Sequence, residues 1–144
     1  MEILIACEES QRVCKAFREK GHNAFSCDIQ ECSGGHPEWH IMRDVIPLLN
    51  GNCEFETVDR TKHKIEGKWD LIIAHPPCTY LSNAGATRLY SKKGVLNQER
   101  YKKGLQSRVF FMRFYNAPCE KICIETFIII LKHFNSSHKK LSFH

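Results

Sequence analysis

The sequence predicts an α/β fold with a mostly parallel sheet and flanking helices. Short apolar segments alternate with helical patterns along the 144 residues, and such alternation is typical of parallel sheets covered by helices. The apolar run at residues 71–74 is continuous rather than alternating, as in a strand that is buried on both faces. A chain of this length is expected to form one domain with a substantial core.

The first predicted elements are a strand, a helix and a second strand. Residues 3–6 form the first strand. Ser10 precedes a helix over residues 11–20 and is placed to cap it, while Gly21 ends that helix. Residues 24–27 form the second strand.

Loops and two more strands are predicted in the middle of the chain. Residues 33–37 form a loop that leads into a short turn or helix, and residues 41–44 form a short third strand. Residues 54–67 are polar with weak alternation, which fits either a hairpin or a surface excursion. Residues 71–74 form the fourth strand, and the two prolines that follow prevent its extension.

A long helix and a fifth strand are predicted near the end. Residues 97–116 show helical spacing of apolar residues, Asn97 can cap the helix, and Pro118 stops it. Residues 121–125 form the fifth strand. The apolar face of the helix is expected to contain Tyr101, Leu105, Arg108 or Val109, Met112 and Tyr115.

Composition and charge favour a reduced, cytoplasmic protein without a membrane span. The hydrophobic fraction of 42% and the charged fraction of 26% are ordinary for a globular protein. No apolar run is long enough to cross a bilayer, and the N-terminus lacks the basic region of a signal peptide. The eight cysteines lack the spacing of a disulfide scaffold. The net charge of +5 permits a polyanionic partner without requiring one.

Cys78 is the candidate nucleophile. It follows the fourth strand after Pro76 and Pro77, at the edge where open α/β sheets place their ligands. A thiol held on a rigid turn at that edge can attack an electrophilic carbon. The alternative is a structural cysteine in a loop.

Carboxylates follow most of the predicted strands. Asp28 follows the second strand, about twenty residues after the first, where nucleoside-binding sheets use an acid to bind ribose hydroxyls. Acids that only cap solvated turns are the alternative. The other acids in such positions are Glu8, Glu9, Asp44 and Glu125.

Two other kinds of site are less favoured. Cys27, Cys32, His36 and His40 have spacings that a zinc site could use, but Cys27 lies within a predicted strand, so no metal site is expected. A Ser-His-Asp hydrolase would need a nucleophile elbow, which the sequence lacks.

Several of these motifs resemble the cytosine-5 DNA methyltransferases, in particular short members from phages and bacteria. Residues 70–78, with Ser82 following, resemble the catalytic Pro-Cys motif of that family. Residues 123–125 resemble the start of its Glu-Asn motif, and residues 36–48 resemble its His-Pro stretch. Residues 3–28 take the place of its cofactor-binding strand, helix and strand.

The resemblance implies an incomplete S-adenosylmethionine-dependent methyltransferase (Rossmann-like) fold over residues 1–126. Residues 127–144 form an atypical tail that resembles nothing in the family, and Thr126 stands where the family has Asn. The expectation is therefore a chain truncated or frameshifted after residue 126, with a second chain as the candidate source of the missing half. A bacterial or phage-infected host cell is the expected setting, with restriction-modification as its context.

The chemistry that the resemblance implies is methyl transfer to carbon 5 of a cytosine in DNA. The thiolate of Cys78 would add to carbon 6 and make carbon 5 nucleophilic. Glu125 would bond the ring at N3 and the amino group. The cytosine must leave the duplex for this reaction.

The resemblance also implies a cofactor site and a DNA-binding loop. Asp28 would hold the ribose of S-adenosylmethionine, Ile29 would pack on adenine, and Asp44 would accept from its amino group. The methionine end would be lined by Cys7, Glu8, Glu9 and Pro76. The polar, basic segment 79–103 lies where the family has a mobile loop that closes over the flipped base, or is a solvated loop and helix face. Its candidate DNA-binding residues are Ser82, Arg88, Lys92 and Lys93.

Two other functions remain open. Amino-group DNA methyltransferases also have a Pro-Pro turn after an apolar strand, but with an aromatic residue in place of Cys78, so Tyr80 would have to serve. A catalytically inactive truncated module that binds S-adenosylmethionine or DNA is the non-enzyme alternative.

Overall fold

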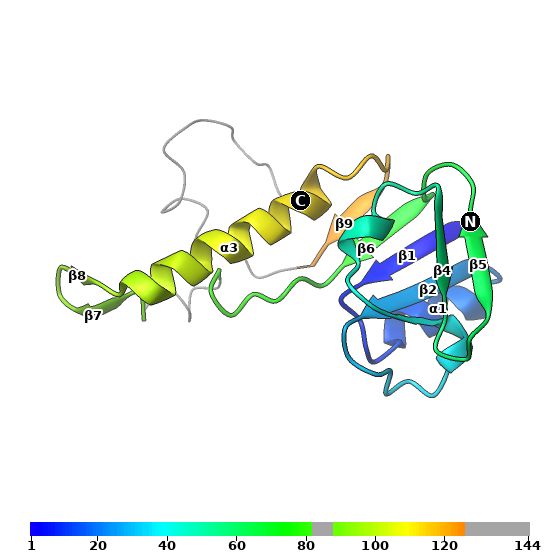
Figure 1. Cartoon of the computed structure of the whole chain (residues 1–144), viewed down its shortest axis with the longest axis horizontal. Helices are drawn as coiled ribbons and strands as arrows, with labels where there is room; N and C mark the ends of the chain where they lie inside the picture. Colours follow the sequence, from blue (N-terminus) through cyan, green and yellow to red (C-terminus); the bar gives the residue numbers. More distant parts are fainter. Residues whose placement is uncertain (82–87, 126–144) are drawn as a thin grey trace. The chain divides into compact units, whose positions relative to one another are not determined.

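A computed structural model of the chain describes residues 1–81 and 88–125 (Figure 1). These residues fall into two compact units, which are described separately. The first contains residues 1–76 and 110–125, and the second contains residues 77–81 and 88–109. The predicted tail, residues 127–144, lies outside the described residues.

A parallel sheet of five strands forms the first unit, in the order β3-β2-β1-β6-β9. The prediction of an α/β fold with a parallel sheet is therefore confirmed. All five strands lie within two residues of the positions predicted from the sequence at both ends. Their bounds are β1 (Glu2–Ala6), β2 (Asn23–Asp28), β3 (His40–Met42), β6 (Leu71–Ala74) and β9 (Ile122–Ile124).

The register of the sheet aligns the carboxyl ends of its central strands. Ala6 of β1 pairs with Cys27 on one side and with Ala74 on the other, and Ala74 in turn pairs with Ile124. The residues that follow these strands therefore emerge from one edge of the sheet.

Helix α1 (Arg12–Glu19) packs on one face of the sheet. Its Cys14 and Phe17 lie in a cluster with Ile3 and Ile5 of β1 and Ala24 of β2. Gly21 has a φ of 82° and its N–H donates to the carbonyl of Arg18, so the predicted glycine end of this helix is confirmed.

A hairpin and the end of a second helix cover the other face. Strands β4 (Cys53–Glu56) and β5 (Lys62–Ile65) pair antiparallel, which confirms the hairpin interpretation of this segment. Phe55 and Ile65 of the hairpin join Phe114 in a core with Leu4 and Ile72. Burial of each such side chain contributes about 2 kcal/mol to folding.

Short 3-10 turns and the second unit complete the described chain. The turns are η1 (Pro37–Trp39) and η2 (Ile46–Leu48). The second unit contains the hairpin β7 (Tyr90–Lys92) and β8 (Val95–Leu96) and most of α3 (Gln98–Tyr115). The Asn97 side chain accepts from the N–H of Arg100 at 3.0 Å, as its predicted role as a cap requires. Within the ranges that the structure describes, no helix is long and apolar enough to span a membrane.

Three sequence predictions are wrong in detail. Ser10 does not cap α1, as described below. The predicted apolar face of α3 includes Val109, which is 64% exposed, whereas the structure buries Phe111 and Phe114. Asp44 does not end a strand, because β3 ends at Met42. The described part of segment 79–103 contains the β7–β8 hairpin and the start of α3, which agrees with the helix predicted from residue 97.

Candidate functional site

The candidate site lies where the strand order changes direction along the sheet. From β1, the strands β2 and β3 follow on one side of the sheet, and β6 and β9 follow on the other side. Ligands of open α/β sheets bind outside the carboxyl ends of the strands at such a point, here between β1 and β6. A pocket of about 290 Å³ opens there, between the turn after β1 and the residue after β6. Its lining residues are Cys7, Glu8, Glu9, Ser10, Arg12, Val13 and His75.

The turn between β1 and α1 is strained at two residues. Cys7 has a φ of 60° and Gln11 a φ of 57°, and a left-handed conformation costs about 1–2 kcal/mol for residues with a side chain. The Cys7 N–H donates to the carbonyl of Cys27 at 2.8 Å, and Gln11 is held by its buried side chain. The chain thus makes, without glycine, a tight turn of the kind for which nucleotide-binding sheets use glycine.

Glu8 occupies the N-terminus of α1. Its carboxylate accepts from the N–H groups of Val13 at 2.6 Å and Cys14 at 3.2 Å, and its side chain is 6% exposed. An anion at this position is stabilised by the free N–H groups and by the helix dipole. Glu8, and not Ser10, therefore caps the helix, and the helix end is closed to a second anion.

The next residue along the turn, Glu9, ties the turn to a neighbouring loop. Its carbonyl accepts from the N–H of Ser33 at 3.0 Å, and its carboxylate accepts from the hydroxyl of Ser33. Both predicted acids of this turn, Glu8 and Glu9, line the pocket and carry structural hydrogen bonds as well.

His75 and Glu125 meet at the carboxyl edge of the sheet. The Nδ1 atom of His75 lies 3.0 Å from Oε2 of Glu125, and the Nε2 atom of His75 is buried without a hydrogen-bond partner among the described residues. Glu125 is 72% exposed in its side chain. Glu125 was predicted from the sequence as a site residue, whereas His75 was not. A histidine between a buried strand and a Pro-Pro turn was the available signal.

Asp28 and Asp44 face the same region from β2 and from the loop after β3. Burial raises the pKa of the Cys7 thiol to about 12, and the nearby carboxylates of Asp28 and Asp44 add to that shift. Asp28 also accepts from the N–H of Gln30 at 2.9 Å, and Asp44 from that of Ile46 at 3.0 Å. Both acids therefore cap turns, but each also lies close enough to Cys7 to raise the pKa of its thiol.

Ile29 is an exposed apolar residue beside Asp28. Its side chain is 76% exposed, next to a carboxylate at the end of β2. Pro76, directly after His75, is buried. An exposed apolar side chain beside an acid can stack on a flat, polar-edged group such as a nucleobase.

Cys78 belongs to the second unit and is partly exposed. Its carbonyl accepts from the N–H of Leu81 at 3.0 Å, which closes a turn after the two prolines. Tyr80 has the guanidinium of Arg100 5.1 Å from its ring centroid and the ammonium of Lys103 at 5.9 Å. Cations thus contact the aromatic ring that an amino-group methyltransferase would need.

The predicted DNA-binding residues of the described chain lie on or beside the β7–β8 hairpin. Arg88, Lys92 and Lys93 are all exposed, and Lys93 with Gly94 forms the turn between the two strands. Ser82 lies outside the described residues.

Two of the four candidate zinc ligands, His40 and Cys27, have other partners. His40 is fully buried, with its ring nitrogens 2.8 Å from Ser26 Oγ and 2.9 Å from the Gln30 carbonyl. Cys27 contacts the Arg43 carbonyl at 3.4 Å through its sulfur, and burial raises its pKa to about 12. Across residues 1–81 and 88–125, no group of three or more metal-binding side chains comes together.

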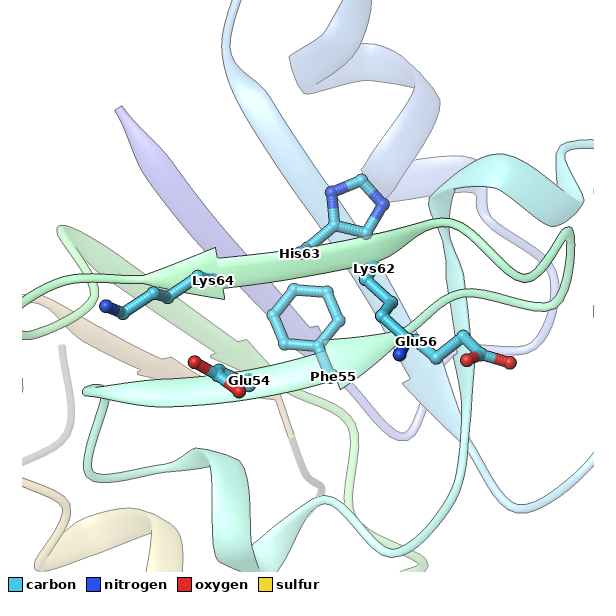
Figure 2. A pocket seen from close by; sticks show the side chains of 6 residues that line it. All are labelled: Glu54, Phe55, Glu56, Lys62, His63 and Lys64. Carbon is cyan, nitrogen blue, oxygen red and sulfur yellow. The ribbon is translucent and has the colours of Figure 1, made fainter.

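A second hollow, of about 470 Å³, lies on the β4–β5 hairpin. Figure 2 shows its lining side chains, which come from both strands of the hairpin. Opposite charges face each other across the strands, because Glu54 pairs with Lys64 and Glu56 with Lys62. This surface is balanced in charge and has the character of a solvated hairpin.

No protein-family model, curated protein or solved structure matches this chain.

Proposed function

We propose that this chain binds S-adenosylmethionine at the carboxyl edge of its sheet and methylates cytosine in DNA through Cys78. The strand order β3-β2-β1-β6-β9 corresponds to the order 3-2-1-4-5 of nucleotide-binding sheets. The pocket and the acids of the edge lie at the point where that fold binds its ligand. The motif resemblance then selects the reaction.

The observation that carries the proposal is the position of the Glu8 carboxylate. Dinucleotides place their pyrophosphate on the helix N-terminus that follows the first strand. Glu8 already accepts from two N–H groups there, so a phosphate would meet a negative charge. S-adenosylmethionine is a nucleoside with a sulfonium and an ammonium and no phosphate, and therefore fits this edge better.

The residues of the edge match the parts of that cofactor. Asp28 offers a carboxylate for ribose hydroxyls, and exposed Ile29 offers an apolar surface for adenine. Asp44 can accept from the adenine amino group. Cys7, which stays protonated because its pKa is raised to about 12, offers a neutral wall for the methionine end, with the acids Glu8 and Glu9 near the ammonium. When bound, the cofactor supplies the methyl group.

Cys78 and Glu125 would act on the cytosine. The thiolate of Cys78 forms a bond to carbon 6, and the electron pair of the 5,6 double bond moves to make carbon 5 nucleophilic. Glu125, protonated on the oxygen that faces N3, donates to N3 and accepts from the amino group, which stabilises the charge of the adduct. After carbon 5 gains the methyl group, a base removes its proton, the double bond re-forms, and the bond between sulfur and carbon 6 breaks.

The β7–β8 hairpin would contact the DNA backbone. Its exposed cations, Arg88, Lys92 and Lys93, can neutralise phosphates without reading the sequence. A DNA partner is also compatible with the net charge of +5. The contact of Arg100 with Tyr80 favours the cysteine mechanism over the amino-group alternative. A target nucleobase would have to displace the Arg100 guanidinium in order to stack on the Tyr80 ring.

A covalent trap tests the proposal. Fluorine at carbon 5 blocks the final proton removal, so a cytosine-5 enzyme remains bonded to 5-fluorocytosine. The chain is incubated with S-adenosylmethionine and a random-sequence duplex pool that contains 5-fluorocytosine, and the adduct is measured by mass spectrometry. We expect an adduct with the wild type and none with Cys78→Ser. An adduct that forms equally in both would overturn the cysteine mechanism.

Calorimetric titration separates cofactor binding from chemistry. We expect saturable binding of S-adenosylmethionine by the wild type and binding weakened about tenfold or more by Asp28→Ala, which removes the acceptor for ribose hydroxyls. Binding without any adduct would identify the inactive binding module. A folded chain without binding would refute the proposed cofactor site.

A further inference from the structure

The backbones of His75 and Glu125 are anchored to the central strands of the sheet. The backbone N–H of His75 donates to the Ala6 carbonyl of β1 at 2.9 Å, and the backbone N–H of Glu125 donates to the Ala74 carbonyl of β6 at 2.9 Å. Ala74 and Ile124 are paired in the sheet register. His75 and Glu125 therefore follow two neighbouring strands at the same level, with their backbones fixed by the central strands.

The contact between the two side chains defines where the proton lies. Nδ1 of His75 is 3.0 Å from Oε2 of Glu125, which is a hydrogen-bond distance. When Glu125 is ionised, its carboxylate only accepts, so the hydrogen of this contact then lies on Nδ1. The carboxylate has further lone pairs, and Glu125 is 72% exposed in its side chain. Each carboxyl oxygen has two lone-pair sites, so Glu125 can keep His75 on Oε2 and still meet a ligand with both oxygens.

The second ring nitrogen separates His75 from a histidine that only fills space. Nε2 of His75 is buried and has no partner among residues 1–81 and 88–125. Buried polar atoms without partners are rare, and such an atom calls for a functional or structural reason. Here the ring lies in the orientation that pairs Nδ1 with Glu125, while Nε2 has no partner among these residues.

We propose that His75 is a positioning residue: its Nδ1–H orients the Glu125 carboxylate toward the hydrogen-bonding edge of the target base. This inference rests on the proposed function, because Glu125 is there the group that holds the base. Without His75 the exposed carboxylate would be free to turn toward water, and a misplacement of about 1 Å can cost about a hundredfold in rate.

Two amide variants distinguish positioning from space filling. In His75→Asn the amide lies close to the former place of Nδ1 and can still donate to Glu125, whereas in His75→Gln it lies near the former place of Nε2. We expect His75→Asn to form the 5-fluorocytosine adduct within about threefold of the wild-type rate. We expect His75→Gln to be slower by about a hundredfold. Equal losses in the two variants would refute the positioning role.

A measurement on the ligand-free chain keeps the two proposals separable. Nitrogen-15 NMR of the histidine rings, assigned with His75→Gln, reports which nitrogen carries the hydrogen. We expect the Nδ1–H form for His75 in the wild type and a change of tautomer population in Glu125→Ala. The Nε2–H form in the wild type overturns the positioning role whatever the activity. The absence of a wild-type adduct overturns only the proposed function.

Discussion

His40 begins strand β3 and His75 directly follows strand β6 of the same sheet. Both ring nitrogens of His40 have partners, whereas only one ring nitrogen of His75 has a described partner. His40 belongs to a buried chain of hydrogen bonds that we call the His40 network (Gln11, Ser26 and His40). Gln11 donates to Ser26 Oγ at 3.2 Å, and His40 lies 2.8 Å from that hydroxyl and 2.9 Å from the Gln30 carbonyl. His75 has Glu125 on one nitrogen and no described partner on the other.

This difference separates a structural polar cluster from a candidate functional one. A buried network in which every member is satisfied makes the fold rigid and specific. The His40 network does so at β2 and β3, and it also holds the loop before η1 through contacts of Gln11 with the backbone of His36. The pair of His75 and Glu125 lies at the carboxyl edge and ends in an exposed carboxylate, where a ligand can reach it.

The largest predicted difference is in the free energy of unfolding that is lost when each histidine is replaced by alanine. His40→Ala leaves a cavity, removes one partner of Ser26 Oγ and removes the imidazole partner of the Gln30 carbonyl, so the free energy of unfolding should fall by about 3 kcal/mol. His75→Ala should lower it by about 1 kcal/mol or less, because only one contact, to an exposed partner, is lost. Urea denaturation measures both. Similar losses would contradict the division into structural and functional clusters.

A substitution at Gly34 tests the far end of the His40 network. A Cβ at Gly34 would lie 2.5 Å from Cβ of Gln11 and 2.7 Å from the carbonyl of Ser10. Gly34→Ala should therefore lower the free energy of unfolding by about 2 kcal/mol. Gly35→Ala is the matched control, since it meets nothing within 4 Å and pays only for its φ of 86°, which costs about 1 kcal/mol. Thermal or urea unfolding that ranks Gly35→Ala as the more damaging would show that the loop moves away from Gln11.

The thiols beside the carboxyl-edge acids give the smallest predicted effect, and it depends on pH. Burial raises the pKa of Cys27 from 9.0 to about 12. Between these values the unfolded chain loses the proton and the folded chain keeps it, so stability is full below about pH 9 and falls as the pH rises toward 12. The loss per thiol is on the order of 1 kcal/mol per pH unit.

Urea unfolding in reducing buffer at about pH 8 and about pH 10 measures this loss. The variant Cys27→Ala should show a smaller decrease between the two pH values than the wild type, although it is less stable at both. An equal decrease in the two proteins would mean that Cys27 ionises in the folded chain as readily as in the unfolded one.

Local sequence signals predicted most of the fold of the first unit. The strands at residues 3–6, 24–27 and 71–74 are confirmed, as is the end of α1 at Gly21. These features depend on apolar runs and on glycine, which act within a few residues. The prediction that Ser10 caps α1 was wrong, because the left-handed turn at Cys7 and Gln11 brings Glu8 to the helix end instead.

The buried face of α3 could not be chosen from the sequence. Aromatic and aliphatic residues occur on more than one side of this helix, so several apolar faces have helical spacing. Phe114 is buried because the sheet and the β4–β5 hairpin leave room for it beside Phe55 and Ile72. Packing partners far along the chain decide such a choice.

By itself, the sequence determined which segments become strands and that acids follow them. It also placed Cys78 behind a strand and a Pro-Pro turn, because these properties depend on side-chain polarity and backbone restriction within a few residues. Only the tertiary structure decided the order of the strands, the closure of the α1 N-terminus by Glu8, and the contact of His75 with Glu125. These depend on which distant strands pair, and that choice follows from packing of the whole core rather than from any local pattern.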